Sequence, residues 1–340
     1  MWQLDFTSAL YLGMRHPSCQ LAPWRALTLG QPAALRELAA ASIVAARLAR
    51  LQGRQAACLL PSTLHLYWDL FGMFASEPLA VLVDEASYPI ARWGAERAQA
   101  LGLPLRRFAC GDVPALRALV CGWRGRGRRP LILADGVVPG RERQPPLAAY
   151  AALARRHGGY LLLDDTQALG VLGPDGGGAA RRHGLQGEHV VIAASLAKGF
   201  GVPLAVLAGG AALIGRFMAR SQTRVHASPP SAAVLAASGR ALDINARDGA
   251  LLRARLAANL AQWRAGLAGA GIACRGGAFP VQHLPGRAHW HAALQAAGVR
   301  ALAQQGGLTF LLRADHAPAQ LARAIGLLDY FARSHDERVI

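Results

Sequence analysis

Lysine is almost absent from this sequence, since Lys198 is the single lysine among 37 lysines and arginines. A guanidinium stays protonated in proteins, whereas a lysine amine can lose its proton where its surroundings lower its pKa from about 10.4. Arginine can therefore supply positive charge but cannot serve as an amine nucleophile. Lys198 is either a solvent-exposed lysine that remains by chance or a residue whose amine the protein requires.

Cysteine is also scarce, and long apolar runs are missing. The five cysteines show no CxxC spacing, which argues against a thiolate metal site or a disulfide framework and indicates reduced thiols of a cytoplasmic protein. No apolar run reaches the roughly 18 residues that a membrane-spanning helix needs. The N-terminal stretch lacks a basic region and carries Asp5, so we do not expect a secretory signal.

Acidic residues are few: 20 oppose 37 basic residues, which gives a net charge of +17. Such a charge attracts nucleic acid or small anionic substrates. The densest basic cluster, at 123–130, is interpreted as a solvated loop, and the sequence contains no recognisable nucleic-acid-binding module. Small anions such as phosphates or coenzyme A are the expected use of the charge, and nucleic acid is the weaker alternative.

Short apolar runs alternate with helix-length segments through the middle of the chain. Continuous apolar runs are typical of strands that are covered on both faces. The pattern predicts an α/β fold with a seven-stranded, mostly parallel sheet between two layers of helices. The connection from the sixth strand to the seventh holds Lys198 and is too short for a helical crossover, so the last strand should be antiparallel. The predicted strands cover residues 56–60, 79–84, 104–109, 130–137, 159–165, 189–195 and 204–210.

Both chain ends are predicted to build a second, smaller domain. We expect a large sheet domain over 36–230 and a small α/β domain formed by 1–35 and 231–340. The small domain should contain one long helix over about 231–267, two strands at FPVQHL and GLTFLLR, and a final helix that begins near Pro318.

Polar residues follow several of the predicted strands at their carboxyl ends, where open α/β sheets bind ligands. Asp164 ends one strand, and its carboxylate could keep a pyridine nitrogen protonated. Ser62 and Thr63 follow another strand at a helix N-terminus, which suits a phosphate but also fits an ordinary helix cap.

Tyr88 and Ser195 follow two further strands. Tyr88 could stack on a flat cofactor ring, or it could simply be a half-buried side chain. Ser195 precedes Lys198 by three residues and could donate to a phosphate. An amine, an acid for a ring nitrogen, phosphate donors and a ring cover together predict a site for pyridoxal 5'-phosphate (PLP).

The runs YLLLDDTQALGVLGPDGGG and IAASLAKGFGVPLAVLAGG resemble the α-oxoamine synthases, which are fold-type I PLP-dependent transferases related to the class II aminotransferases. The resemblance implies that Lys198 attaches the cofactor and that Asp164 pairs with its ring nitrogen. It also implies a homodimer in which the partner subunit receives a phosphate contact from His226. The other implied cofactor contacts are Ser62, Thr63 and Ser195 for the phosphate and Tyr88 for the ring.

The sequence departs from the family pattern at several positions. Gln167 replaces a histidine that bonds the cofactor's phenolic oxygen, and glutamine can donate a hydrogen bond but cannot carry the proton. Pro139 replaces a serine. Thr309 stands where the family has an arginine for the amino-acid carboxylate, and Arg313, four residues later, is a candidate substitute. These differences predict retained cofactor binding and altered substrate recognition.

The first functional hypothesis is a C-acyltransferase that joins an amino acid or an amine to an acyl thioester of coenzyme A or a carrier protein. Lys198 would also act as the base that removes the α-proton. One alternative is a PLP-dependent aminotransferase or decarboxylase, and another is a non-catalytic homologue with a basic partner-binding surface. His289 and His291 are spaced like neighbours on a strand face, but a third ligand is not evident and no metal site is expected.

Overall fold

The computed structural model describes residues 4–304 and 306–336, and its chain divides into two compact units. The larger unit consists of Arg15–Val138 and Arg143–Arg247. The smaller unit consists of Met1–Met14, Pro139–Glu142 and Asp248–Ile340, within the limits of the described residues.

The unit boundaries lie elsewhere than the predicted 36–230. The segment after residue 14 belongs with the larger unit, where His16 Nε2 lies 2.8 Å from the carbonyl oxygen of Phe200. The first part of the long helix α9 (Ala232–Gly269) also belongs with the larger unit, because its side chains contact that unit. Asn245, for example, donates to the carbonyl oxygen of Asp175 at 2.9 Å. Both differences arise from tertiary contacts rather than from a change in local composition.

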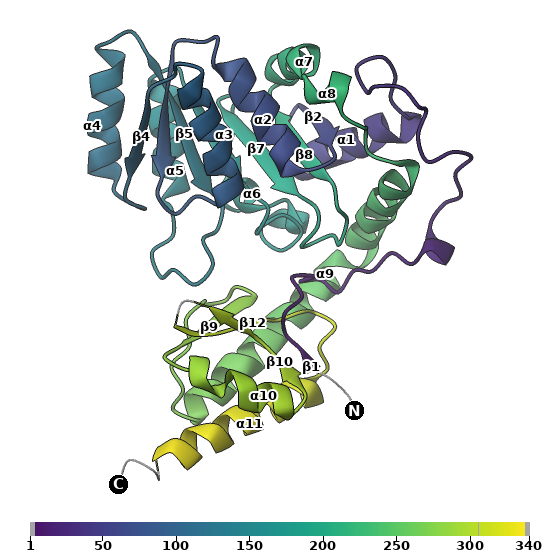
Figure 1. Cartoon of the computed structure of the whole chain (residues 1–340), viewed down its shortest axis with the longest axis vertical. Coiled ribbons are helices and arrows are strands. Elements are labelled where there is room, and N and C mark those ends of the chain that lie inside the picture. Colours follow the sequence, from purple (N-terminus) through teal and green to yellow (C-terminus); the bar gives the residue numbers. More distant parts are fainter. Residues whose placement is uncertain (1–3, 305, 337–340) are drawn as a thin grey trace. The chain divides into compact units, whose positions relative to one another are not determined.

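The sheet of the larger unit has seven strands in the order β2-β8-β7-β6-β5-β3-β4. Figure 1 shows this sheet, with β4 at one side and β2 at the other. Strand β8 runs antiparallel to both of its neighbours, and the other pairs are parallel. The predicted fold class and the reversed last strand are therefore confirmed. The strands are β2 (Ala56–Leu60), β3 (Leu79–Asp84), β4 (Leu105–Phe108), β5 (Arg129–Asp135), β6 (Tyr160–Asp164), β7 (Val190–Ser195) and β8 (Ala205–Gly209).

Helices cover both faces of this sheet. Alternation along β5 sends Leu131 and Leu133 into a core with α2, α3 and α7, and Ile132 and Ala134 into a second core with α4, α5 and α6. This double burial explains why the strands are continuously apolar. The helices are α1 (Ala39–Leu51), α2 (Thr63–Phe74), α3 (Pro89–Ala100), α4 (Val113–Arg124), α5 (Leu147–Arg156), α6 (Ala179–Arg182), α7 (Ala211–Arg220) and α8 (Thr223–His226), with short 3-10 turns at Ser18–Gln20 and Pro174–Gly176.

The smaller unit combines a short parallel pair of strands with a three-stranded antiparallel sheet. Strand β1 pairs with β10, and β12 lies between β11 and β9. Aromatic side chains form its core, where the ring centroid of Trp263 lies 5.5 Å from that of Phe6 and 4.9 Å from that of Phe310. Its elements besides α9 are β1 (Leu4–Asp5), β9 (Val281–Pro285), β10 (Val299–Arg300), β11 (Leu302–Gln304), β12 (Gly307–Leu311), α10 (His291–Ala296) and α11 (Pro318–Asp336).

The AHWHAA segment is not a strand. A 3-10 turn over Ala288–Trp290 leads directly into α10, so His289 and His291 do not share a strand face. Across residues 4–304 and 306–336, no group of three or more His, Cys, Asp or Glu side chains could hold a metal ion. In the same described part of the chain, no helix combines the length and the apolar character that crossing a membrane requires.

Candidate active site

Four aspartates gather at the carboxyl ends of three neighbouring parallel strands. Asp84 ends β3, Asp135 ends β5, and Asp164 ends β6 with Asp165 directly after it. All four side chains are buried, and Asp135 and Asp164 are paired residues in adjacent strands. Burying carboxylates together is unfavourable unless each finds donors or a cation, so this edge is a candidate functional site.

The two consecutive aspartates of β6 have different roles because successive side chains point to opposite faces. Both oxygens of Asp165 accept from the backbone N–H of Ala179 at 3.0 Å, which ties the start of α6 to the sheet. Burial raises the pKa of Asp165 to about 7. Asp164 instead accepts from the hydroxyl of Tyr67 at 2.8 Å and from the backbone N–H of Thr166 at 3.0 Å.

Lys198 lies in the turn between β7 and β8, and its side chain is half-buried. Burial lowers the pKa of its amine, while the carboxylates of Asp164 and then Asp135 oppose that shift. The Nζ atom lies 5.9 Å from the centroid of the Tyr88 ring, within the range of a cation–π contact. The side-chain amine of the single lysine therefore lies near the aspartate cluster instead of in open solvent.

Backbone contacts fix the lysine turn against the loop that follows Asp164. A Cβ at Gly199 would lie 2.3 Å from the carbonyl oxygen of Leu169, so only glycine fits there. Gly170 adopts a φ of +87° and packs on Gly199, where a Cβ at Gly170 would lie 3.2 Å from the Gly199 Cα. Thr166 adds a tie, since its Oγ1 accepts from the backbone N–H of Ser195 at 3.0 Å.

Ser62 and Thr63 lie at the start of α2, as predicted. Ser62 is the N-cap, its Oγ accepts from the backbone N–H of His65 at 3.4 Å, and it lies 2.8 Å from His65 Nδ1. The ordinary capping role is thus present. The helix N-terminus still offers backbone donors and the positive end of its dipole to an anion.

The remaining predicted cofactor contacts occupy distinct places in the larger unit. Tyr88 is the N-cap of α3 and is 53% exposed, and Ser195 Oγ accepts from the backbone N–H of Ala197 at 3.2 Å. Gln167 is half-buried in the loop after β6. His226 is exposed at the end of α8 and lines a cavity of about 320 Å³ with Thr28, residues 30–32 and residues 225–229.

Thr309 and Arg313 belong to the smaller unit and already have partners there. Arg313 Nε donates to Asp315 Oδ1 at 2.8 Å, and its Nη1 donates to the carbonyl oxygen of Asp5 at 3.0 Å. Thr309 Oγ1 lies 3.0 Å from Nδ1 of His283. Both residues are buried, and these contacts give each of them a structural role in the smaller unit. A substrate role for either one stays a prediction.

The sequence interpretation overlooked Tyr67, Asp135 and Thr166. Asp135 had a usable signal, because it ends the apolar run PLILAD in the same way as Asp164 ends YLLLD. Thr166 lies in the quoted motif but had no assigned role. Tyr67 carried no signal, since an apolar position in an amphipathic helix does not reveal where its hydroxyl points.

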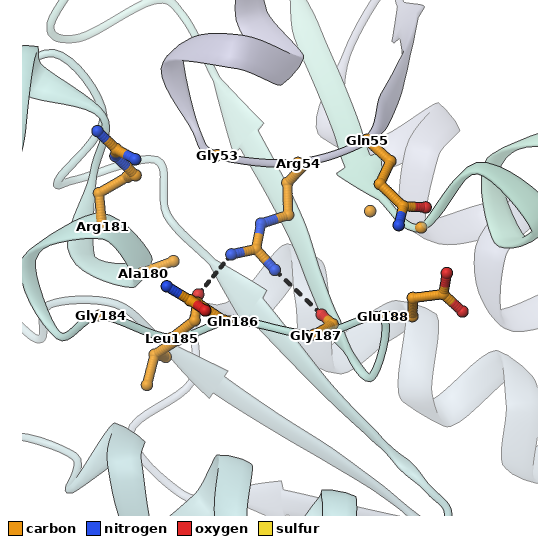
Figure 2. Close-up of a pocket in the computed structure, with 12 residues that line it drawn as sticks. Gly53, Arg54, Gln55, Ala180, Arg181, Gly184, Leu185, Gln186, Gly187 and Glu188 are labelled. Carbon is orange, nitrogen blue, oxygen red and sulfur yellow. Dashed lines mark hydrogen bonds between the residues drawn. The ribbon is translucent and has the colours of Figure 1, made fainter.

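A cavity of about 300 Å³ lies at the opposite edge of the sheet, where β2 begins and β8 ends. Figure 2 shows Arg54 in this cavity with its guanidinium directed at two backbone carbonyls. It donates to Gly187 at 3.2 Å and to Leu185. Burial and the nearby charge of Arg181 lower the pKa of Arg54. Arg54 therefore fixes the 184–188 loop, and the cavity is separate from the Lys198 cluster.

Comparison of the chain with known proteins identifies its family. The family described as aminotransferase class I and II matches residues 143–328, more than half of the chain. The chain belongs to this family. Among curated members, the 8-amino-7-oxononanoate synthase of Alkalilimnicola ehrlichii is 36% identical over 224 residues, which cover 65% of this chain and 56% of that protein. The 8-amino-7-oxononanoate synthase of Geobacter metallireducens is 34% identical over 237 residues, which cover 65% of this chain and 60% of that protein. The chain thus matches less than two thirds of the length of these relatives.

Solved structures agree on the fold of this class I and II family member. A serine palmitoyltransferase from Sphingomonas wittichii superposes with a TM-score of 0.85 at 17% identity, covering 98% of this chain and 88% of that one. The 8-amino-7-oxononanoate synthase of Francisella tularensis gives 0.77 at 16% identity and covers 99% of both chains. The fold-type I architecture and the resemblance to the α-oxoamine synthases are confirmed.

The residues at the carboxyl edge fit PLP. A half-buried amine with a lowered pKa faces a buried carboxylate that two donors hold in place. The same edge carries the N-terminus of α2 for a phosphate and the Tyr88 ring for a flat cofactor. A serine palmitoyltransferase of S. paucimobilis with this fold was solved with PLP and myriocin bound.

Proposed function

We propose that the protein is a PLP-dependent C-acyltransferase that joins an amino acid or an amine to an acyl thioester of coenzyme A or a carrier protein. The observation that carries the proposal is that the only lysine side chain lies near both the Tyr88 ring and the carboxyl groups of Asp164 and Asp135. The 8-amino-7-oxononanoate synthases among the curated relatives support acyl transfer over transamination or decarboxylation.

Bound PLP supplies an electron sink for negative charge that develops on the carbon beside the substrate nitrogen. Lys198 would hold the cofactor and later accept the proton from that carbon, a role that its lowered pKa favours. Asp164, kept in place by Tyr67 and Thr166, would hold a proton on the ring nitrogen through a charge-assisted hydrogen bond.

The remaining contacts would bind and orient. Ser62, Thr63 and the first N–H groups of α2 would hold the phosphate, with Ser195 nearby. Tyr88 would cover the ring. Gln167 would donate to the phenolic oxygen but could not exchange a proton there, which should shift the pH profile of activity relative to an enzyme with histidine.

The first test is the absorption spectrum of the purified protein with added PLP. We expect a visible band that borohydride bleaches, and mass spectrometry should locate the reduced adduct on Lys198. Lys198→Arg keeps the charge and Lys198→Ala removes it, and both should lose the adduct. A wild-type protein without such a band at saturating PLP would exclude the proposed chemistry.

The second test separates acyl transfer from the alternatives. Amino acids and acyl-coenzyme A thioesters are offered together, and free thiol is measured. Thiol release that requires both substrates and Lys198 supports the acyltransferase. Keto-acid or carbon dioxide formation without a thioester would instead identify an aminotransferase or a decarboxylase, and cofactor binding without any turnover would favour a non-catalytic homologue.

We also propose a homodimer. Leu64 and Trp68 on α2 and Trp93 on α3 are 48%, 48% and 54% exposed, an unusual apolar exposure for a surface that meets only water. Light scattering should give twice the chain mass for the wild type, and Trp93→Arg should lower it. A cytoplasmic location is proposed as well, since the five cysteines, all within the described residues, form no disulfide.

A further inference from the structure

The turn that carries Tyr88 is anchored to the neighbouring strand β5 at two points. The backbone N–H of Tyr88 donates to Oδ1 of Asp135 at 3.1 Å, and Ser87 Oγ donates to the carbonyl oxygen of Leu133 at 3.4 Å. The Asp135 contact is the shorter of the two and acts on the residue whose ring faces Lys198. These two hydrogen bonds from the turn to β5 therefore fix the position of the Tyr88 backbone, from which the ring extends.

Three charged groups interact with the carboxyl group of Asp135. Burial, and after it the charge of Asp164 in the adjacent strand, raises the pKa of Asp135. Asp84 acts in the same direction, and Lys198 opposes them. Tyr67 lies close enough for the Asp135 charge to affect its own pKa. A carboxyl group in these surroundings favours its neutral form, which still accepts a backbone hydrogen bond through its carbonyl oxygen.

We propose that Asp135 is a positioning residue whose carboxyl oxygen holds the backbone of Tyr88 so that the ring covers the amine of Lys198. The functional meaning of this role depends on the proposed PLP site, but the contact belongs to the protein alone. A competing explanation is that Asp135 supplies negative charge to balance Lys198. The two explanations differ in whether the site needs the charge or the oxygen in its present position.

Three substitutions at this position separate oxygen from charge. Asp135→Asn keeps an acceptor oxygen in the same place without the charge, Asp135→Glu keeps the charge but moves it by one methylene, and Asp135→Ala removes both. Asp112→Ala is a matched control, because Asp112 accepts from the backbone N–H of Ala115 at 2.9 Å at the start of another helix. All variants are compared without cofactor.

Hydrogen–deuterium exchange of the peptide that contains the Tyr88 amide is the first measurement. Loss of one hydrogen bond predicts exchange about tenfold faster in Asp135→Ala, with Asp135→Asn close to wild type and Asp135→Glu between them. Asp112→Ala should raise exchange only at the start of α4. The proposal is supported if Asn protects the Tyr88 amide better than Glu, and it is overturned if Glu protects as well as Asn or better. This comparison still decides the question if the Ala variant does not fold.

Acetylation of Lys198 gives a second readout without cofactor, since Lys198 carries the only lysine side chain of the sequence. Its rate should follow the same order, fastest in Asp135→Ala, because an uncovered amine is more accessible. A rate in Asp135→Ala equal to wild type, in a folded protein, would overturn the link between Asp135 and the ring cover. Failure of the wild type to bind PLP would reject the proposed function and leave both measurements interpretable.

Discussion

Removing the Tyr67 hydroxyl tests how far the buried carboxylate of Asp164 depends on its donors. Tyr67→Phe keeps the ring in its core position and deletes the hydrogen bond of 2.8 Å to Asp164 Oδ2. Burial, and secondarily the Asp164 charge, raises the pKa of Tyr67, so the wild-type hydroxyl remains a donor at neutral pH. The substitution leaves one carboxylate oxygen in a buried place without that donor.

The expected cost follows from the burial of both partners. A hydrogen bond to a charged group contributes about 1.5–3 kcal/mol, and Asp164 is only 6% exposed, so water cannot readily replace the hydroxyl. The free energy of unfolding in urea should fall by about that amount. PLP affinity should fall by about tenfold, because a loosened Asp164 pairs less well with the ring nitrogen.

Tyr150→Phe is the matched control for this experiment. Tyr150 is also fully buried and donates to the strand-end carboxylate of Asp84 at 2.9 Å, but it lies in the core on the other face of the sheet. Its hydroxyl also accepts from the backbone N–H of Gly111 at 3.0 Å, so Tyr150→Phe should lose at least as much free energy of unfolding as Tyr67→Phe, with little change in PLP affinity. Equal losses of PLP affinity in the two variants, or an unchanged stability of Tyr67→Phe, would refute the reasoning.

Three further predictions concern the turn, the amine and the N-terminal segment. Gly199→Ala places a Cβ 2.3 Å from a carbonyl oxygen and should weaken PLP binding, whereas Gly215→Ala meets nothing within 4 Å in a helix and should stabilise by about 0.5–1 kcal/mol in urea unfolding. The pH midpoint for acetylation of Lys198 should lie below about 10.4, because burial lowers its pKa, and a midpoint at or above that value contradicts the buried site. Arg224→Ala removes the ion pair of 2.6 Å with Glu37, which is 26% exposed, and should cost about 1.5–3 kcal/mol by calorimetry, more than the exposed pair lost in Arg107→Ala.

Sequence patterns located the strands of the larger unit well, and the cofactor roles of Lys198 and Asp164 stay predictions. The apolar runs at 56–60 and 79–84 match β2 and β3 exactly in their bounds, because a strand covered on both faces must be apolar throughout. The isolated lysine and the two motifs placed Lys198 and Asp164 at one sheet edge, since parallel strands end together. The division into units at residues 14 and 247 differs from the predicted bounds of 36 and 230, because the segment after residue 14 and the first part of α9 contact the larger unit.

The amino-acid sequence by itself determined the α/β pattern, the single available amine and the carboxylate that ends β6. Only the tertiary structure decided which groups hold that carboxylate and cover that amine. Tyr67 lies 97 residues before Asp164, and Asp135 lies 47 residues after Tyr88. Contacts over such separations depend on side-chain directions that packing sets, and neither periodicity nor motif spacing records them.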